Sequence, residues 1–268
     1  MRRNQRGSGR GLLWVTGVAV AAVLGLTGYA ALSGSSHNSA TPSNDGTPSS
    51  SSAPTSSASP IPVPTVTIPS TWTEPLRWLA MPRGARTVAN GDQVGFPQTA
   101  DGAVAMLVSA STVNVEGATS TADQQLAIYN TYMDAADKSA ASEQQIRDRA
   151  AQTEASERSA LGLPASGPLP SGAFVRTNVV GFKVIQSSPV QVTAFLLTKV
   201  SQKAGETVAE KDDYTVTTVG VVWQGGDWKL SIQASTEASQ SQAQVPAIAA
   251  PGDAAFNDAG WTAIRQAS

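Results

Sequence analysis

The sequence predicts an α+β protein: an N-terminal transmembrane helix and a disordered linker, followed by helices packed on a curved four-stranded antiparallel sheet. Three observations lead to this expectation. Residues 11–32 carry no charge, residues 99–161 combine helix caps with helical spacing of apolar residues, and residues 173–234 form β-rich segments joined by loops or tight turns. Helices followed by a run of antiparallel strands are the order typical of α+β domains.

The first element is the apolar stretch 11–32, GLLWVTGVAVAAVLGLTGYAAL. A bilayer core of roughly 30 Å needs about 20 helical residues, so this stretch is long enough to span it. Four arginines lie within residues 1–10, and the first acidic residue after the stretch is Asp45. This asymmetry predicts a cytoplasmic tail (1–10), a single-pass signal-anchor in the cell membrane and an extracytoplasmic remainder. The alternative is a signal peptide cleaved after Ala30, which would release a secreted form.

Residues 33–69 are predicted to be a disordered Ser/Thr/Pro linker. Asp45 is their only charge, and so polar a segment cannot bury enough apolar surface to offset its ordering entropy. The end, Pro60–Pro64, should be stiffer and extended, because proline fixes φ. A spacer between membrane and domain is the main interpretation, and a wall-spanning or O-glycosylated stalk also fits.

Composition excludes several classes of chemistry. The chain has no cysteine, which rules out disulfides, thiolate metal sites and cysteine nucleophiles, and its only histidine, His37, lies in the linker. A Ser–His–Asp triad and a histidine-based metal site are therefore not available to the folded domain. We also found no phosphate-binding loop and no calcium-loop motif, so we expect no metal and no cofactor.

Net charge argues against a nucleic-acid partner. Four of the 18 Lys and Arg residues precede residues 11–32, so the part beyond has 14 basic against 20 acidic residues, a net charge of −6. A nucleic-acid binder normally presents a basic face. An acidic surface suits solubility or protein partners instead.

The extracytoplasmic domain is placed at residues 70–235. Ser70–Phe96 is expected to be an ordered strap with little regular structure. Thr99 should cap a buried helix over Ala103–Val115. Thr121 should cap a second helical region. A single helix reaching Leu161 would be about 58 Å long at 1.5 Å per residue, so we expect a break near Ser139–Ser142.

The last third should contain the four strands. Their ranges are Ala173–Gln186, Val190–Gln202, Tyr214–Gln224 and Asp227–Ala234, with Gly225-Gly226 as the turn of the last hairpin. Residues 236–268 are expected to form a fraying tail, in which Phe256 and Trp261 dock a short helix on the domain.

This order, ending in Trp223-Gln-Gly-Gly-Asp-Trp228-Lys-Leu, resembles the nuclear transport factor 2-like fold. Two stretches, Val94–Ala105 (VGFPQTADGAVA) and Arg176–Val184 (RTNVVGFKV), resemble actinobacterial single-pass membrane proteins of uncertain role associated with conjugative or integrative elements. The fold also occurs in bitopic scaffold proteins of type IV secretion systems. The resemblance, over roughly residues 80–235, implies an assembly role by analogy.

Enzymes of this cone-shaped fold place an acid, a base or a tyrosine inside the cone. The residues of those types here are Asp101, Asp212, Asp213, Tyr214, Tyr129 and Tyr132, and for each we favour a structural role. We therefore expect no catalytic residue and a non-enzymatic scaffold or interaction module contacting envelope proteins. The alternative is a small-molecule-binding protein or enzyme that uses the cone cavity. Trp72 and Trp78 are the candidate partner contacts, although a buried strap is the favoured role for both.

Overall fold

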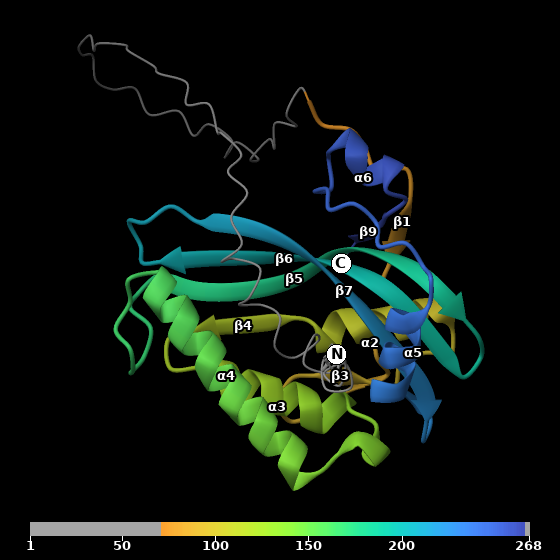
Figure 1. Ribbon diagram of the computed structural model, residues 1–268, viewed down its shortest axis with the longest axis horizontal. Coiled ribbons are helices and arrows are strands. Elements are labelled where there is room, and N and C mark those ends of the chain that lie inside the picture. The colour runs from red at the N-terminus through yellow and green to blue at the C-terminus, as the bar shows by residue number, and fades with distance from the viewer. Residues whose placement is uncertain (1–70, 266–268) are drawn as a thin grey trace, which may run out of the picture.

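The computed structural model describes residues 71–265, and Figure 1 shows their arrangement. The predicted membrane anchor (11–32), the predicted linker (33–69) and His37 lie outside the described residues. None of the helices within 71–265 is both long and apolar enough to cross a bilayer.

The described chain is an α+β domain. Its helices are α2 (Ala100–Ala110), α3 (Thr121–Tyr132), a 3-10 turn (Ala135–Asp137), α4 (Ala140–Ala160), α5 (Ile232–Gln240) and α6 (Ala254–Asp258). Its strands are β1 (Trp78–Ala80), β2 (Arg86–Thr87), β3 (Gln93–Val94), β4 (Val113–Glu116), β5 (Ala173–Ser187), β6 (Gln191–Ala204), β7 (Lys211–Gln224), β8 (Asp227–Leu230) and β9 (Thr262–Arg265).

A seven-stranded mixed sheet is the centre of the domain. Its order is β1-β9-β5-β6-β7-β8, and β4 pairs with β5 beside that path. The long strands β5, β6 and β7 are antiparallel, whereas β1 and β9 run parallel to one another. At the left of Figure 1 the strands follow one another as β4, β5, β6 and β7, with β7 outermost.

The two faces of this sheet support separate cores, because successive side chains of a strand point to opposite faces. On β6, Ala194 and Leu196 join a cluster with α2, α3 and β8, while Phe195 and Leu197 join a second cluster with the C-terminal segment. The second cluster is centred on Phe256 and Trp261, which are fully buried. The sheet is therefore covered by α2 and α3 on one face and by the chain after β8 on the other.

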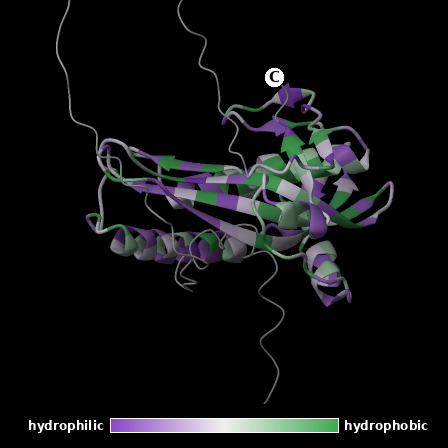
Figure 2. Ribbon diagram, turned by 90° about the horizontal axis from the view of Figure 1, so that it is seen from above, coloured by the Kyte–Doolittle hydropathy of each residue, from purple (hydrophilic) through white to green (hydrophobic). Residues whose placement is uncertain are grey.

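Helix α4 is the most polar helix of the domain. Only four of its 21 residues are buried, and Figure 2 draws it mainly in hydrophilic and pale colours. Ser139 caps its first turn by accepting a hydrogen bond from the Ser142 amide. The predicted break between two helices is confirmed, although it falls slightly earlier, at Met133–Ser139.

Two of the predicted helix limits are wrong. The helix capped by Thr99 ends at Ala110 rather than Val115, because Val113–Glu116 pair with β5 as the short strand β4. Ser120, not Thr121, caps α3: its hydroxyl accepts from the Asp123 amide. The Thr99 cap itself is confirmed, since its hydroxyl accepts from Gly102.

The four predicted strands are present as β5 to β8 and are antiparallel, but the expectation of a purely antiparallel four-stranded sheet is wrong. The sheet gains β4 and the parallel pair β1 and β9, and the predicted strap contains β1, β2 and β3. The predicted strand to Ala234 ends at Leu230, where Ser231 caps α5. Beyond residue 235 the chain continues as α5, α6 and β9, and α6 with Phe256 and Trp261 docks on the domain.

Candidate functional site

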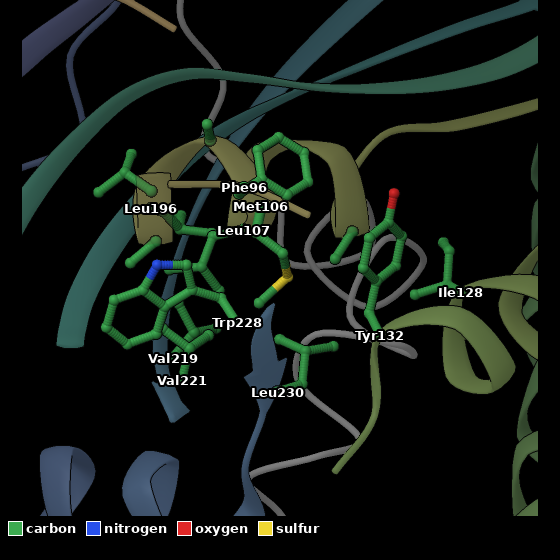
Figure 3. Close-up of a cluster of buried hydrophobic side chains, with 14 of the residues drawn as sticks. Phe96, Met106, Leu107, Ile128, Tyr132, Leu196, Val219, Val221, Trp228 and Leu230 are labelled. Carbon is green, nitrogen blue, oxygen red and sulfur yellow. The ribbon is translucent and has the colours of Figure 1, made fainter. Parts of the chain in front are cut away.

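The space between α2, α3 and the sheet is filled by the protein's own side chains. Trp228, Met106 and Leu107 are fully buried there, and Figure 3 shows how closely they surround one another. The polar atoms in this core are bonded to backbone: the Trp228 indole donates to the Pro97 carbonyl at 2.8 Å, and the Tyr132 hydroxyl donates to the Gln93 carbonyl at 2.9 Å. Burial raises the pKa of Tyr132 further above its usual value.

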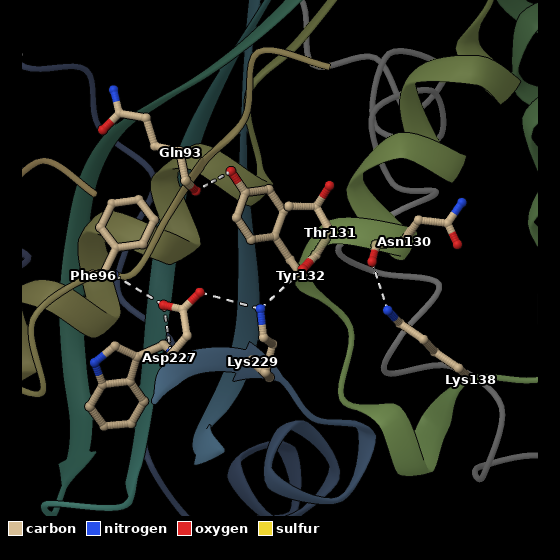
Figure 4. Close-up of polar contacts among 9 residues, drawn as sticks. Gln93, Phe96, Asn130, Thr131, Tyr132, Lys138, Asp227 and Lys229 are labelled. Atoms are coloured by element: carbon tan, nitrogen blue, oxygen red, sulfur yellow. Dashed lines mark hydrogen bonds and ion pairs between the residues drawn. The ribbon is translucent and has the colours of Figure 1, made fainter. Parts of the chain in front are cut away.

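Asp227 is the buried acid of this region, and Figure 4 shows its contacts. One carboxylate oxygen accepts from the amides of Phe96 and Trp228, both at 3.0 Å, and the other lies 3.3 Å from the ammonium of Lys229. That ammonium also donates to the Thr131 carbonyl at 3.1 Å. All these partners belong to the fold: the carboxylate ties β8 to the segment before α2, and Lys229 ties β8 to the end of α3.

The structure places Asp101 on α2, and Asp212 and Asp213 on β7. Asp101 is exposed in the first turn of α2, where a carboxylate suits the positive end of the helix dipole. Asp212 is 3.0 Å from the Lys199 ammonium and accepts from the Ser201 hydroxyl at 2.6 Å. Desolvation raises the pKa of Asp212, but the contacts with Ser201 and Lys199 outweigh it and hold that pKa below its usual value. Asp213, the next residue, is exposed.

The tyrosines of the cone are likewise engaged in the fold. The Tyr129 hydroxyl accepts from the Ser139 amide at 2.8 Å, at the start of α4. Tyr214 lies half-buried on β7, away from both α3 tyrosines in sequence and in element, and burial raises its pKa. Tyr214 packs against the C-terminal core, whereas Tyr129 and Tyr132 belong to the core on the other face of the sheet.

A cleft lies where one edge of β5 has no strand beside it. Strand β4 pairs with β5 at 174–177 and β9 pairs with it at 181–182, so residues 178–180 have no strand neighbour on that side within the described chain. A pocket of about 280 Å³ lies there, between β5, the C-terminal half of α2 and the segment after β1. We call it the edge cleft.

The polar lining of the edge cleft can bind but has no general acid or base in it. Its polar side chains are Arg83, Gln93, Ser109, Thr112 and Asn178, and the rest of the lining is apolar. Amides, hydroxyls and a guanidinium can hydrogen-bond to an oxygen-rich ligand. Proton transfer at neutral pH would call for a carboxylate, histidine or tyrosine, and none of the described lining residues is of these types.

Metal binding receives no support in the part of the chain described. Residues 71–265 contain no group of three or more Asp, Glu, His or Cys side chains that could hold an ion. Several acidic residues instead pair with Lys or Arg, as in Arg176–Glu116 at 2.8 Å and Arg158–Glu154 at 2.9 Å.

Trp72 and Trp78, the candidate partner contacts, share one carboxylate. Their indoles donate to the two oxygens of Glu74, at 3.1 Å from Trp72 and 3.0 Å from Trp78. The Arg265 guanidinium lies 4.5 Å from the centre of the Trp78 ring, which also packs on the C-terminal core. Trp72 is 38% exposed and lies against Gly252. Trp72 is thus the more accessible of the two.

Two features were missed by sequence reasoning. The role of Asp227 was hidden because its partner amide, Phe96, is 131 residues away. The only local signal was an acid directly after the Gly225-Gly226 turn. The edge cleft depends on which parts of β5 the strands β4 and β9 occupy, and neither short strand carries a clear β pattern.

Comparisons with known proteins add no family. No protein-family model, no curated protein and no solved structure matches the chain significantly.

Proposed function

We propose that this protein is a non-enzymatic, membrane-anchored scaffold whose extracytoplasmic domain binds other envelope proteins. In this proposal residues 11–32 are the anchor, 33–69 the spacer, and the α+β domain a nuclear transport factor 2-like cone. The assembly it serves is a conjugative or type IV secretion-like apparatus, by the resemblance of residues 94–105 and 176–184. Nucleic acid is not among its partners.

One observation carries the proposal: an acid and two phenols of the kind that could do chemistry in such a cone, Asp227, Tyr129 and Tyr132, hold the fold instead. Asp227 bonds two amides and Lys229, and the hydroxyls of Tyr129 and Tyr132 bond the backbone. A catalytic group must reach substrate with a free proton donor or acceptor. Groups so fully engaged are better suited to a rigid platform.

A platform also needs a place to contact partners. Trp72 exposes part of a large amphipathic ring beside the C-terminal segment, and aromatic residues are common at the centres of interfaces. Because Trp72 is among the first described residues, it would lie where the spacer meets the domain. This position fits a contact with neighbouring envelope components.

In-cell crosslinking of the full-length protein, followed by purification under denaturing conditions, tests the scaffold role. We expect specific envelope proteins to be recovered, and Trp72→Ala to reduce their yield. Val208→Ala is a matched control, since Val208 is also exposed but lies in the β6–β7 loop. If no envelope protein is recovered from the wild type, the scaffold proposal fails.

The edge cleft supports a second candidate, a ligand-binding cone. Its volume of about 280 Å³ is near the lower end of small-molecule pockets, and Arg83, Gln93 and Asn178 supply hydrogen-bonding groups. A thermal-shift screen of small carboxylates and sugars against wild type and Asn178→Leu would decide. A ligand that raises the melting temperature of the wild type, but not of the variant, would favour this candidate over the scaffold.

A further inference from the structure

The outer edge of β7 is the longest strand edge without a neighbouring strand in the described chain, although α5 and the segment after it pack on one face of β7. On its inner side β7 pairs with β6 from Lys211 to Val222. On its outer side β8 pairs only with residues 221–224. Residues 211–219 therefore have no strand beside them on that side among residues 71–265, and Figure 1 shows β7 at the margin of the sheet there.

The direction of the backbone groups along this edge follows from Gly220. Its carbonyl accepts from the Ser231 amide and its amide donates to the Ser235 hydroxyl, both on the outer side of β7. Backbone groups of a strand alternate in direction with period two. The outward-pointing residues of the free edge are therefore Asp212, Tyr214, Val216 and Thr218. No hydrogen bond joins their outward amides or carbonyls to any described residue.

Natural edge strands are usually protected by proline, bulges or charge. Residues 211–219, KDDYTVTTV, contain no proline or glycine, and their pairing with β6 is regular throughout. Of the three charges, Asp212 is already compensated by Lys199. Six of the nine residues are Thr, Val or Tyr, which favour strands. This edge is well suited to accept another strand.

We propose that the β7 edge pairs with β7 of a second copy, antiparallel and centred on Thr215, so that the two sheets become continuous across a twofold axis. This register places Tyr214 opposite Val216 of the partner and Asp212 opposite its Thr218. All four outward residues of each copy then form hydrogen-bonded pairs, about eight bonds in total. Tyrosine opposite a β-branched residue is a favourable cross-strand pair, and no charge faces a like charge.

Neighbouring registers are poorer. Centring on Val216 sets Asp212 against Gly220 of the partner, whose backbone is already bonded to Ser231 and Ser235. Centring on Asp213 places two like charges directly opposite one another and leaves Thr218 without a pair within the free edge. The register centred on Thr215 is thus the one that uses the whole edge, which is why a second copy fits it better than an arbitrary strand.

Disulfide crosslinking tests the register directly, because the chain has no cysteine of its own. Thr215→Cys would face its own copy at a non-hydrogen-bonded position, about 4.5 Å between Cα atoms, which is within disulfide range. Thr217→Cys is the matched control on the same sheet face. It would lie about 13 Å from its copy, four residues along the strand. In the full-length detergent-solubilised protein we expect at least about tenfold more disulfide dimer from Thr215→Cys.

A second variant tests the surface without a crosslink. Val216→Pro removes an outward amide and keeps the β6 ladder, since proline is tolerated at strand edges. By light scattering we expect a dimer for the wild type and a monomer with unchanged circular dichroism for Val216→Pro. The proposal is overturned by a wild-type monomer, by equal crosslinking of the two cysteine variants, or by a crosslink from Thr215→Cys to a different protein in cells. It does not depend on the scaffold role, which the recovery of other envelope proteins tests separately.

Discussion

Two carboxylates, Asp227 on β8 and Glu157 on α4, are almost equally buried but have opposite surroundings. Asp227 is 6% exposed and Glu157 7%. The first accepts from two amides and faces an ammonium at 3.3 Å. The second faces an apolar hollow lined by residues such as Leu161, Leu169 and Val175, and no hydrogen bond or ion pair reaches its carboxylate from the described residues.

The difference lies in what each carboxylate does for the fold. Asp227 joins segments 131 residues apart, so its burial is offset by the bonds it makes. Burial, and to a smaller extent the negative charge of Glu154, raise the pKa of Glu157 to about 7. Its neighbour Arg158 is directed elsewhere, to Glu154 and to the carbonyls of Pro164 and Gly167. Burial alone therefore does not identify a stabilising acid.

The largest change in stability is expected from removing the carboxylate of Asp227, which makes more hydrogen bonds than that of Glu157. Asp227→Ala leaves two buried amides and the Lys229 ammonium without their acceptor, which should cost about 3–5 kcal/mol of unfolding free energy. Urea denaturation followed by tryptophan fluorescence would measure it. Asp258→Ala, an exposed acid on α6, should stay close to wild type. A loss for Asp227→Ala no larger than that of the control would show that these bonds do not stabilise the fold.

Replacing Glu157 should stabilise the fold, and the size of this stabilisation should depend on pH. The pKa of Glu157 is about 4.5 when unfolded and about 7 when folded, so the folded state binds the proton more tightly. Its contribution is thus fully present below pH 4.5 and is lost as pH rises through 7, by about 3 kcal/mol. In Glu157→Gln we expect this loss to be absent, giving a variant whose advantage over wild type grows between pH 5 and 8. If the stability of the two proteins had the same pH dependence, the pKa of Glu157 would not be raised by its burial.

Removing only the cation beside Asp227 should have a smaller effect. In Lys229→Met the stem is kept and the carboxylate retains both amide donors, so we expect a loss of about 1–2 kcal/mol. The same urea experiment would measure it. Lys203→Met, a half-buried lysine on β6 without an ion pair among the described residues, is the control. If Lys229→Met were as damaging as Asp227→Ala, the ion pair rather than the amides would be the main contribution.

Features set by neighbours in sequence could be predicted. The Thr99 cap, the break before α4 and the Gly225-Gly226 turn each depend on a few adjacent residues, and both glycines adopt the positive φ such a turn requires. These are local backbone and capping effects, which propensity describes well.

Features set by distant partners could not be predicted. Strand β4 is only Val113–Glu116, which followed an apolar helix without a break in composition, and its partner lies about 60 residues on. The parallel pairing of β1 with β9 joins the two ends of the described chain, and short strands give no periodicity that reports it. The unpartnered state of Glu157 likewise depends on where Arg158 is directed. The edge cleft and the surroundings of Asp227 and Glu157 could therefore not be predicted from the sequence, because each depends on residues distant in the chain or on the direction of a neighbouring side chain.

The smallest expected effect separates the two causes of the raised pKa of Glu157. Glu154→Gln removes the nearby negative charge while its amide oxygen can still accept from Arg158, as Glu154 does at 2.9 Å. Desolvation is the larger cause and remains, so the midpoint of the pH-dependent stability should fall by less than about one pH unit. Glu143→Gln, at the other end of α4, should leave the midpoint unchanged. A fall to the ordinary range of glutamate would mean that charge repulsion, not burial in the apolar hollow, sets the behaviour of Glu157, and the contrast with Asp227 would then be one of charge rather than of hydrogen bonding.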